Sequence, residues 1–137
     1  GHGHAPDYAT LWSDDGIVLG GDQLLPGISA NIGVYPTEPE ADPLTEWLAS
    51  CHSFMPLARD DLLVLPGHNL PYTGLPFRLA QMTAAGCFPA LFRREIGPAE
   101  HGLALVEAIA HLNCLLRRGR VSRSLTPDGA WAWERTA

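Results

Sequence analysis

The chain has 137 residues, a formal net charge of −6 at pH 7 and an apolar share of 46%. This length allows one domain or two small ones, and the apolar share is sufficient to build a core. The negative charge argues against binding nucleic acid through overall charge, although a local basic patch is compatible with it. No stretch approaches the ~20 consecutive apolar residues of a membrane span, so the sequence predicts no membrane contact.

The cysteines and the first residues of the chain indicate its compartment. We find no signal-peptide pattern at the start. Cys51, Cys87 and Cys114 are an odd number of cysteines without close pairing. We therefore expect reduced cysteines packed in the helices of a cytoplasmic protein.

Two short β-type runs come first in the chain. Residues 8–12 and 17–19 are separated by the turn cluster at residues 13–16, which predicts a β-hairpin. Residues 26–42 are irregular and rich in Pro, Gly and Asn. Because apolar residues still punctuate this segment, we expect an ordered surface loop rather than a linker.

A helix is predicted to begin directly after this loop. Asp42 can cap it, and Pro43 suits its first turn, where the missing N–H has no partner in any case. Pro56 ends it. Apolar residues at three- and four-residue spacing predict one buried face, made of Leu44, Trp47, Leu48, Cys51, Phe54 and Met55.

The next two elements are shorter. Residues 62–65 are a fully apolar run of strand length, typical of a strand that is covered on both faces. A short helical stretch is expected over residues 77–82.

The character of the sequence changes at Thr83. A second strong helix is expected after Gly97-Pro98, with Gly119 at its C-terminal cap. Two β-type runs, 121–125 and 130–133, are joined by Thr126-Pro127-Asp128-Gly129, which is a strong hairpin signal. A helix followed by a hairpin predicts a winged-helix-like unit at residues 83–137, separate from residues 1–82.

Three segments carry side chains that can ligate a metal. His4 lies in Gly3-His4-Ala5-Pro6, Asp22 follows an apolar strand run, and His68 follows another. Imidazole and carboxylate are ligands of zinc and related divalent ions, and a strand end can place such a side chain with little positional spread. Each residue also has a plainer explanation: His4 as a solvated residue near the start of the chain, Asp22 as a turn residue, and His68 as a loop residue.

Taken together, these segments resemble the C-terminal half of the metallo-β-lactamase fold superfamily. The matching residues are Gly3-His4-Ala5-Pro6-Asp7-Tyr8, Leu19-Gly20-Gly21-Asp22-Gln23-Leu24-Leu25 and Leu65-Pro66-Gly67-His68-Asn69. They are most similar to the group of hydrolases that resemble glyoxalase II. Ala110-His111-Leu112-Asn113 and Gly119-Arg120-Val121 resemble the winged-helix domain that follows the catalytic domain in one branch of this group.

The resemblance implies an α/β fold: half of a metallo-β-lactamase αβ/βα sandwich, followed by a small winged-helix-like α+β domain. It implies two divalent metal ions, with zinc as the expected metal. His4 would ligate the first ion, Asp22 would bridge both, and His68 would ligate the second. It assigns no further catalytic residue.

The sequence departs from the family pattern in two ways, and both concern segments that the family has and this sequence lacks. The His-x-His-x-Asp-His string of the family is absent, and three ligands cannot fill two catalytic sites. Relatives also carry a longer helical stretch at the position of Met82 and Thr83. We therefore expect a fragment, or a sequence that lacks segments. We also expect its sheet, around Leu11, Val18 and Val64, to be covered by a missing N-terminal half or by a second copy.

The expected function is that of a metal-dependent hydrolase acting on a small molecule. A metal-activated hydroxide would attack an ester, thioester, lactone, β-lactam or phosphodiester. The alternative is a non-catalytic binding module, or a nucleic-acid-processing enzyme that uses its winged-helix-like unit. The arginines that would contact phosphates also suit a helix C-terminus, so we assign no nucleic-acid-binding residue; they are Arg117, Arg118, Arg120 and Arg123.

Overall fold

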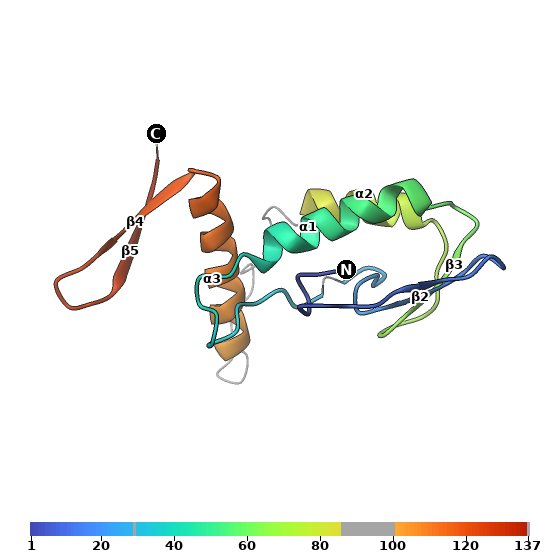
Figure 1. Cartoon of the computed structure of the whole chain (residues 1–137), viewed down its shortest axis with the longest axis horizontal. Helices are drawn as coiled ribbons and strands as arrows, with labels where there is room; N and C mark the ends of the chain where they lie inside the picture. Colours follow the sequence, from blue (N-terminus) through green and yellow to red (C-terminus); the bar gives the residue numbers. More distant parts are fainter. Residues whose placement is uncertain (29, 86–100, 137) are drawn as a thin grey trace.

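The computed structural model describes residues 1–28, 30–85 and 101–136, and it begins with a three-stranded sheet (Figure 1). Its strands are β1 (Leu11–Trp12), β2 (Ile17–Gly21) and β3 (Leu63–Pro66), in the order β1-β2-β3. The antiparallel β1–β2 pair confirms the first hairpin, with a shorter first strand than predicted. β2 and β3 are parallel.

Helix α1 (Pro43–Phe54) begins where the sequence predicted. The Thr45 N–H donates to Asp42 Oδ1 at 3.1 Å, so Asp42 is the N-cap. A 3₁₀ turn, η1 (Met55–Leu57), follows. The buried face of α1 is the predicted one except for Met55, which lies in η1 and is 36% exposed.

Helices α1 and α2 (Leu75–Ala85) cover one face of the sheet, as Figure 1 shows. Val18 and Val64 point toward these helices and are completely buried, as are Leu75 and Leu79 of α2. The core therefore lies between the two helices and one side of the three strands.

The opposite face of the sheet is apolar and exposed. Leu11, Ile17, Leu19 and Leu63 are 63%, 38%, 46% and 39% exposed. The prediction that the apolar run at residues 62–65 is covered on both faces is thus wrong for the described residues. Side chains alternate along a strand, so Leu63 points away from the helices that bury its neighbour.

The same alternation corrects our expectation about which residues need a cover. Val18 and Val64 are enclosed by the helices of this chain. Of the three residues named in that expectation, only Leu11 lies on the exposed face.

Helix α2 is longer than predicted. It starts at Leu75 and continues through Met82 and Thr83 to Ala85. The domain boundary predicted between residues 82 and 83 therefore falls inside a helix. The division into residues 1–82 and 83–137 itself stays a prediction.

The C-terminal elements are α3 (His101–Arg117), β4 (Val121–Leu125) and β5 (Trp131–Arg135). Gly119, at φ +65°, ends the helix as predicted, and its N–H donates to the Leu116 carbonyl at 3.0 Å. β4 and β5 form the predicted hairpin, which extends from α3 on the side away from the sheet (Figure 1). The predicted start of this helix, after Gly97-Pro98, lies outside the described residues, and the winged-helix assignment stays a prediction.

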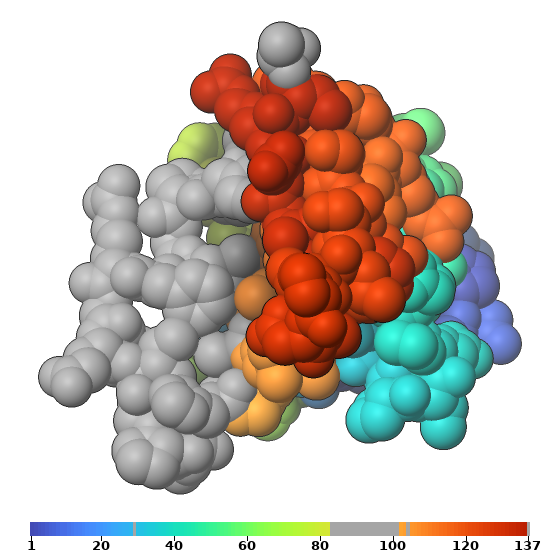
Figure 2. Space-filling model, turned by 90° about the vertical axis from the view of Figure 1, so that its left-hand side faces the viewer, coloured from blue at the N-terminus to red at the C-terminus, as the bar shows by residue number. Residues whose placement is uncertain are grey.

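Residues 39–42 are bound to α3 and the hairpin (Figure 2). The buried Asn113 side chain donates to the carbonyls of Pro39 and Ala41 at 2.9 and 2.8 Å. The Arg123 guanidinium forms a bidentate ion pair with Glu40 at 3.1 and 2.6 Å. Its hydrogen bond holds the pKa of Glu40 below the usual value.

Two arginine side chains, Arg117 and Arg123, make contacts within this chain. Arg123 stacks on Trp131 and Trp133, with 4.4 and 5.5 Å from its guanidinium carbon to the ring centroids. Arg117 donates to the Glu40 carbonyl at 2.8 Å. Two of the four arginines that were candidates for phosphate contacts thus bind this chain instead.

The described cysteines, Cys51 and Cys114, are free and buried. Burial raises the pKa of the Cys51 thiol to about 12, so the thiol is unreactive in the folded state. Cys87 lies outside the described residues.

No helix within the described ranges combines the length and apolar character needed to cross a membrane.

The N-cap provides a test of the α1 assignment. We expect Asp42→Ala to lower the free energy of unfolding by about 1 kcal/mol, because the Thr45 N–H loses its acceptor. Urea denaturation measures the change. Asp15→Ala, in the exposed turn of the first hairpin, is the matched control and should leave stability unchanged. Equal midpoints of urea denaturation for Asp42→Ala and Asp15→Ala would contradict the capping role of Asp42.

Candidate metal centre

The three predicted ligands, which lie far apart in the sequence, come together in the structure. His4 Nε2 lies 3.5 Å from Asp22 Oδ2, and His68 Nε2 lies 3.4 Å from Asp22 Oδ1. The carboxylate is therefore placed between two imidazoles, with one oxygen toward each. Their role as metal ligands stays a proposal.

The parallel pairing of β2 and β3 explains why Asp22 and His68 meet. Gly21 at the end of β2 is paired with Pro66 at the end of β3, so the segments that follow the two strands leave the sheet at the same edge. The Gly67 N–H donates to the Gly21 carbonyl at 2.9 Å and extends this pairing by one step. Side chains that follow the two strands must then lie close together.

The backbone around Asp22 depends on two glycines. Gly21 has φ +50°, where a side chain is strained, and the strand pairing is irregular between Leu19 and Gly21. A Cβ on Gly67 would overlap Asp22 Oδ1. Glycine at position 67 therefore leaves the space that the carboxylate occupies.

His4 is oriented by a main-chain carbonyl. Its Nδ1 lies 2.9 Å from the Asn31 carbonyl oxygen, which can only accept, so Nδ1 carries the hydrogen. In the neutral ring, Nε2 then presents a lone pair to the Asp22 carboxylate. Two acceptors at this separation are stabilised by a proton or a metal cation between them.

His68 is held less tightly than His4. Its side chain is 67% exposed, against 24% for His4 and 27% for Asp22. The next residue, Asn69, has φ +68°, which is uncommon for a residue other than glycine. Asn is one of the residues that adopt this left-handed conformation most readily, and here it lets the chain turn directly after His68.

The distances fit zinc ligands, but the number of donors does not complete a site. Two ligands of one tetrahedral zinc, each about 2.0–2.2 Å from it, lie about 3.3–3.6 Å apart. Both N···O separations fall in this range. Within the part of the chain that the structure describes, however, no three or more His, Cys, Asp or Glu side chains are arranged to hold an ion. Each imidazole–carboxylate pair therefore lacks at least one further ligand.

Tyr8 is part of this site, although the residues of the sequence alone indicated only a strand position for it. Its hydroxyl oxygen accepts a hydrogen bond from the Asp22 N–H at 2.9 Å. Only its inclusion in the segment that resembles the superfamily could have pointed to it. The Asn31 carbonyl had no such signal, because every residue type has a backbone carbonyl.

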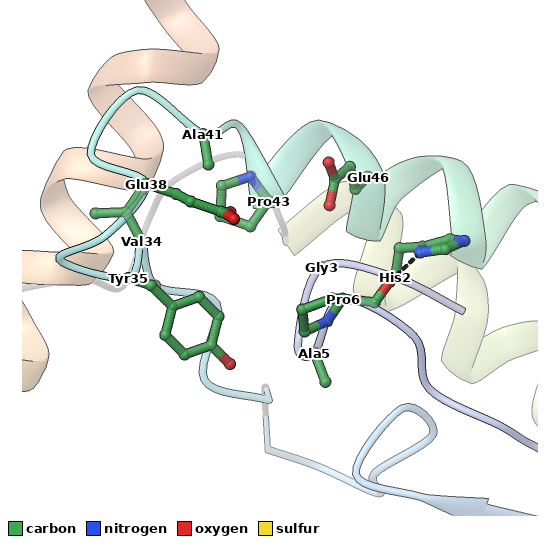
Figure 3. Close-up of a pocket in the computed structure, with 11 residues that line it drawn as sticks. His2, Gly3, Ala5, Pro6, Val34, Tyr35, Glu38, Ala41, Pro43 and Glu46 are labelled. Atoms are coloured by element: carbon green, nitrogen blue, oxygen red, sulfur yellow. Dashed lines mark hydrogen bonds between the residues drawn. The ribbon is translucent and has the colours of Figure 1, made fainter.

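A pocket of about 150 Å³ lies beside the loop that carries His4 (Figure 3). Gly3, Ala5 and Pro6 form one wall, and Figure 3 shows Tyr35 on the opposite side of the opening. None of the three candidate ligands lines it. The pocket is thus a neighbour of the His–Asp–His cluster and not part of it.

Solved structures resemble this chain over nearly its whole length. Residues 77–136 match the family described as metallo-beta-lactamase-like, C-terminal domain. A beta-lactamase domain protein from Burkholderia ambifaria is 35% identical, with a TM-score of 0.88, over 99% of this chain and 46% of that one. A metallo-beta-lactamase family protein from Thermus thermophilus is 27% identical, with a TM-score of 0.77, over 98% and 47%. The chain therefore spans about half the length of both proteins. No curated protein matches the sequence.

The space beside Asp22 can be tested by filling it. We expect Gly67→Ala to displace the Asp22 carboxylate, because the new methyl group would overlap Oδ1, and to cost little stability, because the overlapped atom is the end of a side chain. Urea denaturation and NMR shifts of the His4 and His68 rings measure the two effects. Gly102→Ala is the control for the ring shifts, since a Cβ there meets nothing within 4 Å; because Gly102 lies in α3, this variant should be slightly more stable. Unchanged ring shifts in Gly67→Ala would show that the carboxylate does not depend on this glycine.

Proposed function

We propose that this chain is part of a metallo-beta-lactamase-like hydrolase, and that His4, Asp22 and His68 form part of its dinuclear metal site. Asp22 would bridge the two ions, and each histidine would bind one. Zinc suits this donor set of imidazole nitrogens and carboxylate oxygens.

The observation that carries this proposal is the position of the Asp22 carboxylate. Its two oxygens face two different imidazoles at nearly equal separations of 3.5 and 3.4 Å. Because each oxygen has its own imidazole neighbour, one oxygen and one imidazole could bind each of two ions. The arrangement thus supports two half-sites that share one carboxylate.

The chain's own residues would prepare this site in three ways. The Asn31 carbonyl fixes the His4 tautomer that leaves Nε2 free to bind a metal. The strand ends hold Asp22 at the sheet edge, and Gly67 leaves room for its carboxylate. When bound, two divalent ions supply an acidified water as nucleophile and a positive charge for the oxyanion.

The substrate stays open among ester, thioester, lactone, β-lactam and phosphodiester compounds. All these reactions use the same kind of nucleophile, so the ligand set does not separate them. The assignment to the glyoxalase II-like group is likewise part of the proposal.

The exposed sheet face supports a second component of the proposal, namely that this face has a cover in the working protein. Leu11, Ile17, Leu19 and Leu63 form a contiguous apolar surface on neighbouring strands. A segment of the same protein outside the described residues, or a second copy, would cover it. The same addition would place further ligands near the sheet edge.

The nucleic-acid alternative has little support from the described contacts. Arg117 and Arg123 bind the segment around Glu40 and are not free for phosphates. Arg118 and Arg120 remain exposed at the end of α3. Binding of a nucleic-acid strand that weakens steeply with added salt would support this alternative.

Metal binding tests the bridging role directly. In the protein produced from its full open reading frame, we expect Asp22→Ala to lower zinc affinity by at least about 100-fold and to abolish hydrolysis. Chelator competition and metal analysis measure the affinity and the content. Asp7→Ala is the control, because this carboxylate is in the same loop as His4 but is 96% exposed. Retention of two ions per chain by Asp22→Ala would refute the bridging carboxylate.

The proposed cover of the sheet has its own test. If Leu19 is buried in the working protein, Leu19→Ala should cost about 2–5 kcal/mol, whereas an exposed leucine costs less than about 0.5 kcal/mol. Leu57→Ala, at a residue that is 54% exposed in the 3₁₀ turn after α1, is the control. Light scattering over a range of concentrations separates a second copy from a cover within one chain. A monomer in which both variants are equally stable would rule out a cover.

A further inference from the structure

Tyr8 contacts both of the candidate ligands that come from the first part of the chain. Its hydroxyl oxygen accepts the Asp22 N–H at 2.9 Å. Its ring lies 5.7 Å from the His4 ring, centroid to centroid, at an interplanar angle of 57°. One side chain therefore links the loop of His4 to the turn of Asp22.

The backbone on both sides of this link is fitted to the tyrosine. A Cβ on Gly21 would overlap the Tyr8 hydroxyl, so the hydroxyl occupies the space above that glycine. The Tyr8 N–H donates to the Gly1 carbonyl at 2.8 Å and fixes the tyrosine within the His4 loop. The hydroxyl can thus reach Asp22 only because position 21 has no side chain.

We propose that Tyr8 is a positioning residue that sets the orientation of Asp22 relative to His4; the metal part of this inference rests on the proposed function. The imidazole and the carboxylate belong to loops with no strand pairing between them. The hydrogen bond fixes the main chain of Asp22, and the ring contact restricts the rotation of His4. Without these two contacts, the 3.5 Å separation of His4 Nε2 and Asp22 Oδ2 would vary with the motion of the two loops.

Another tyrosine of the chain shows how this role differs from ordinary packing. Tyr72 packs against the hydrophobic core, and its hydroxyl donates to the Leu24 carbonyl at 3.4 Å. Tyr8 does not belong to the core cluster and is only partly buried. Its contacts are with the ligand segments, so its loss should affect them more than global stability.

The experiment compares Tyr8→Phe with Tyr72→Phe, since each variant removes one hydroxyl bonded to the backbone. Two quantities are measured in the protein from its full open reading frame. The first is the hydrogen-exchange rate of the Asp22 amide without metal, and the second is zinc affinity by chelator competition. For Tyr8→Phe we expect the hydrogen-exchange rate of the Asp22 amide to rise at least about 10-fold. We expect zinc affinity to fall about 10–100-fold, which is the usual effect of losing a hydrogen bond that orients a metal ligand.

Tyr72→Phe should leave both quantities within about twofold of the unsubstituted protein. The inference is overturned if Tyr8→Phe leaves the Asp22 amide equally protected, or if Tyr72→Phe weakens zinc binding to the same extent. Absence of zinc binding by the unsubstituted protein would refute the proposed function. In that case the exchange rate of Asp22 still decides whether Tyr8 orders this turn.

Discussion

The parallel pairing of β2 with β3 is the constraint on which the candidate site depends. The pairing brings the ends of two strands, separated by a loop and a helix in the sequence, to one edge of a small sheet. Asp22 and His68 meet because each follows its strand by one or two residues. A shift of one residue in this register would turn their side chains to opposite faces and separate them.

The parts of the fold that could be predicted are those set by local chemistry. Asp42 and Pro43 marked the start of α1 because a cap acts within one helical turn. The turn at residues 126–129 and Gly119 were recognised for the same reason. The exposed side of Leu63 could not be predicted, because a continuous apolar run has no alternation that shows where the helices lie. For the site, the resemblance nominated His4, Asp22 and His68, but no residue type could indicate the Asn31 carbonyl or the link through Tyr8.

The C-terminal elements are connected to the candidate site through α1. Asn113 and Arg123 hold the segment that ends at Asp42, and Asp42 caps α1. Gly3, next to His4, packs so closely on α1 that a Cβ would meet the Pro43 carbonyl and the Trp47 backbone. A continuous set of packed contacts therefore runs from the hairpin to the loop of the first ligand. The C-terminal elements are thus connected, through α1, to the loop that carries His4.

The one-sided sheet also has a consequence for producing the protein. Four exposed aliphatic side chains on neighbouring strands are the kind of surface that chaperones bind and that drives aggregation during synthesis. Where nothing covers this face, its burial against another apolar surface is favoured. Polar residues at positions 11, 17, 19 and 63 would give a soluble form of the same scaffold, in which Val18 and Val64 still build the interior.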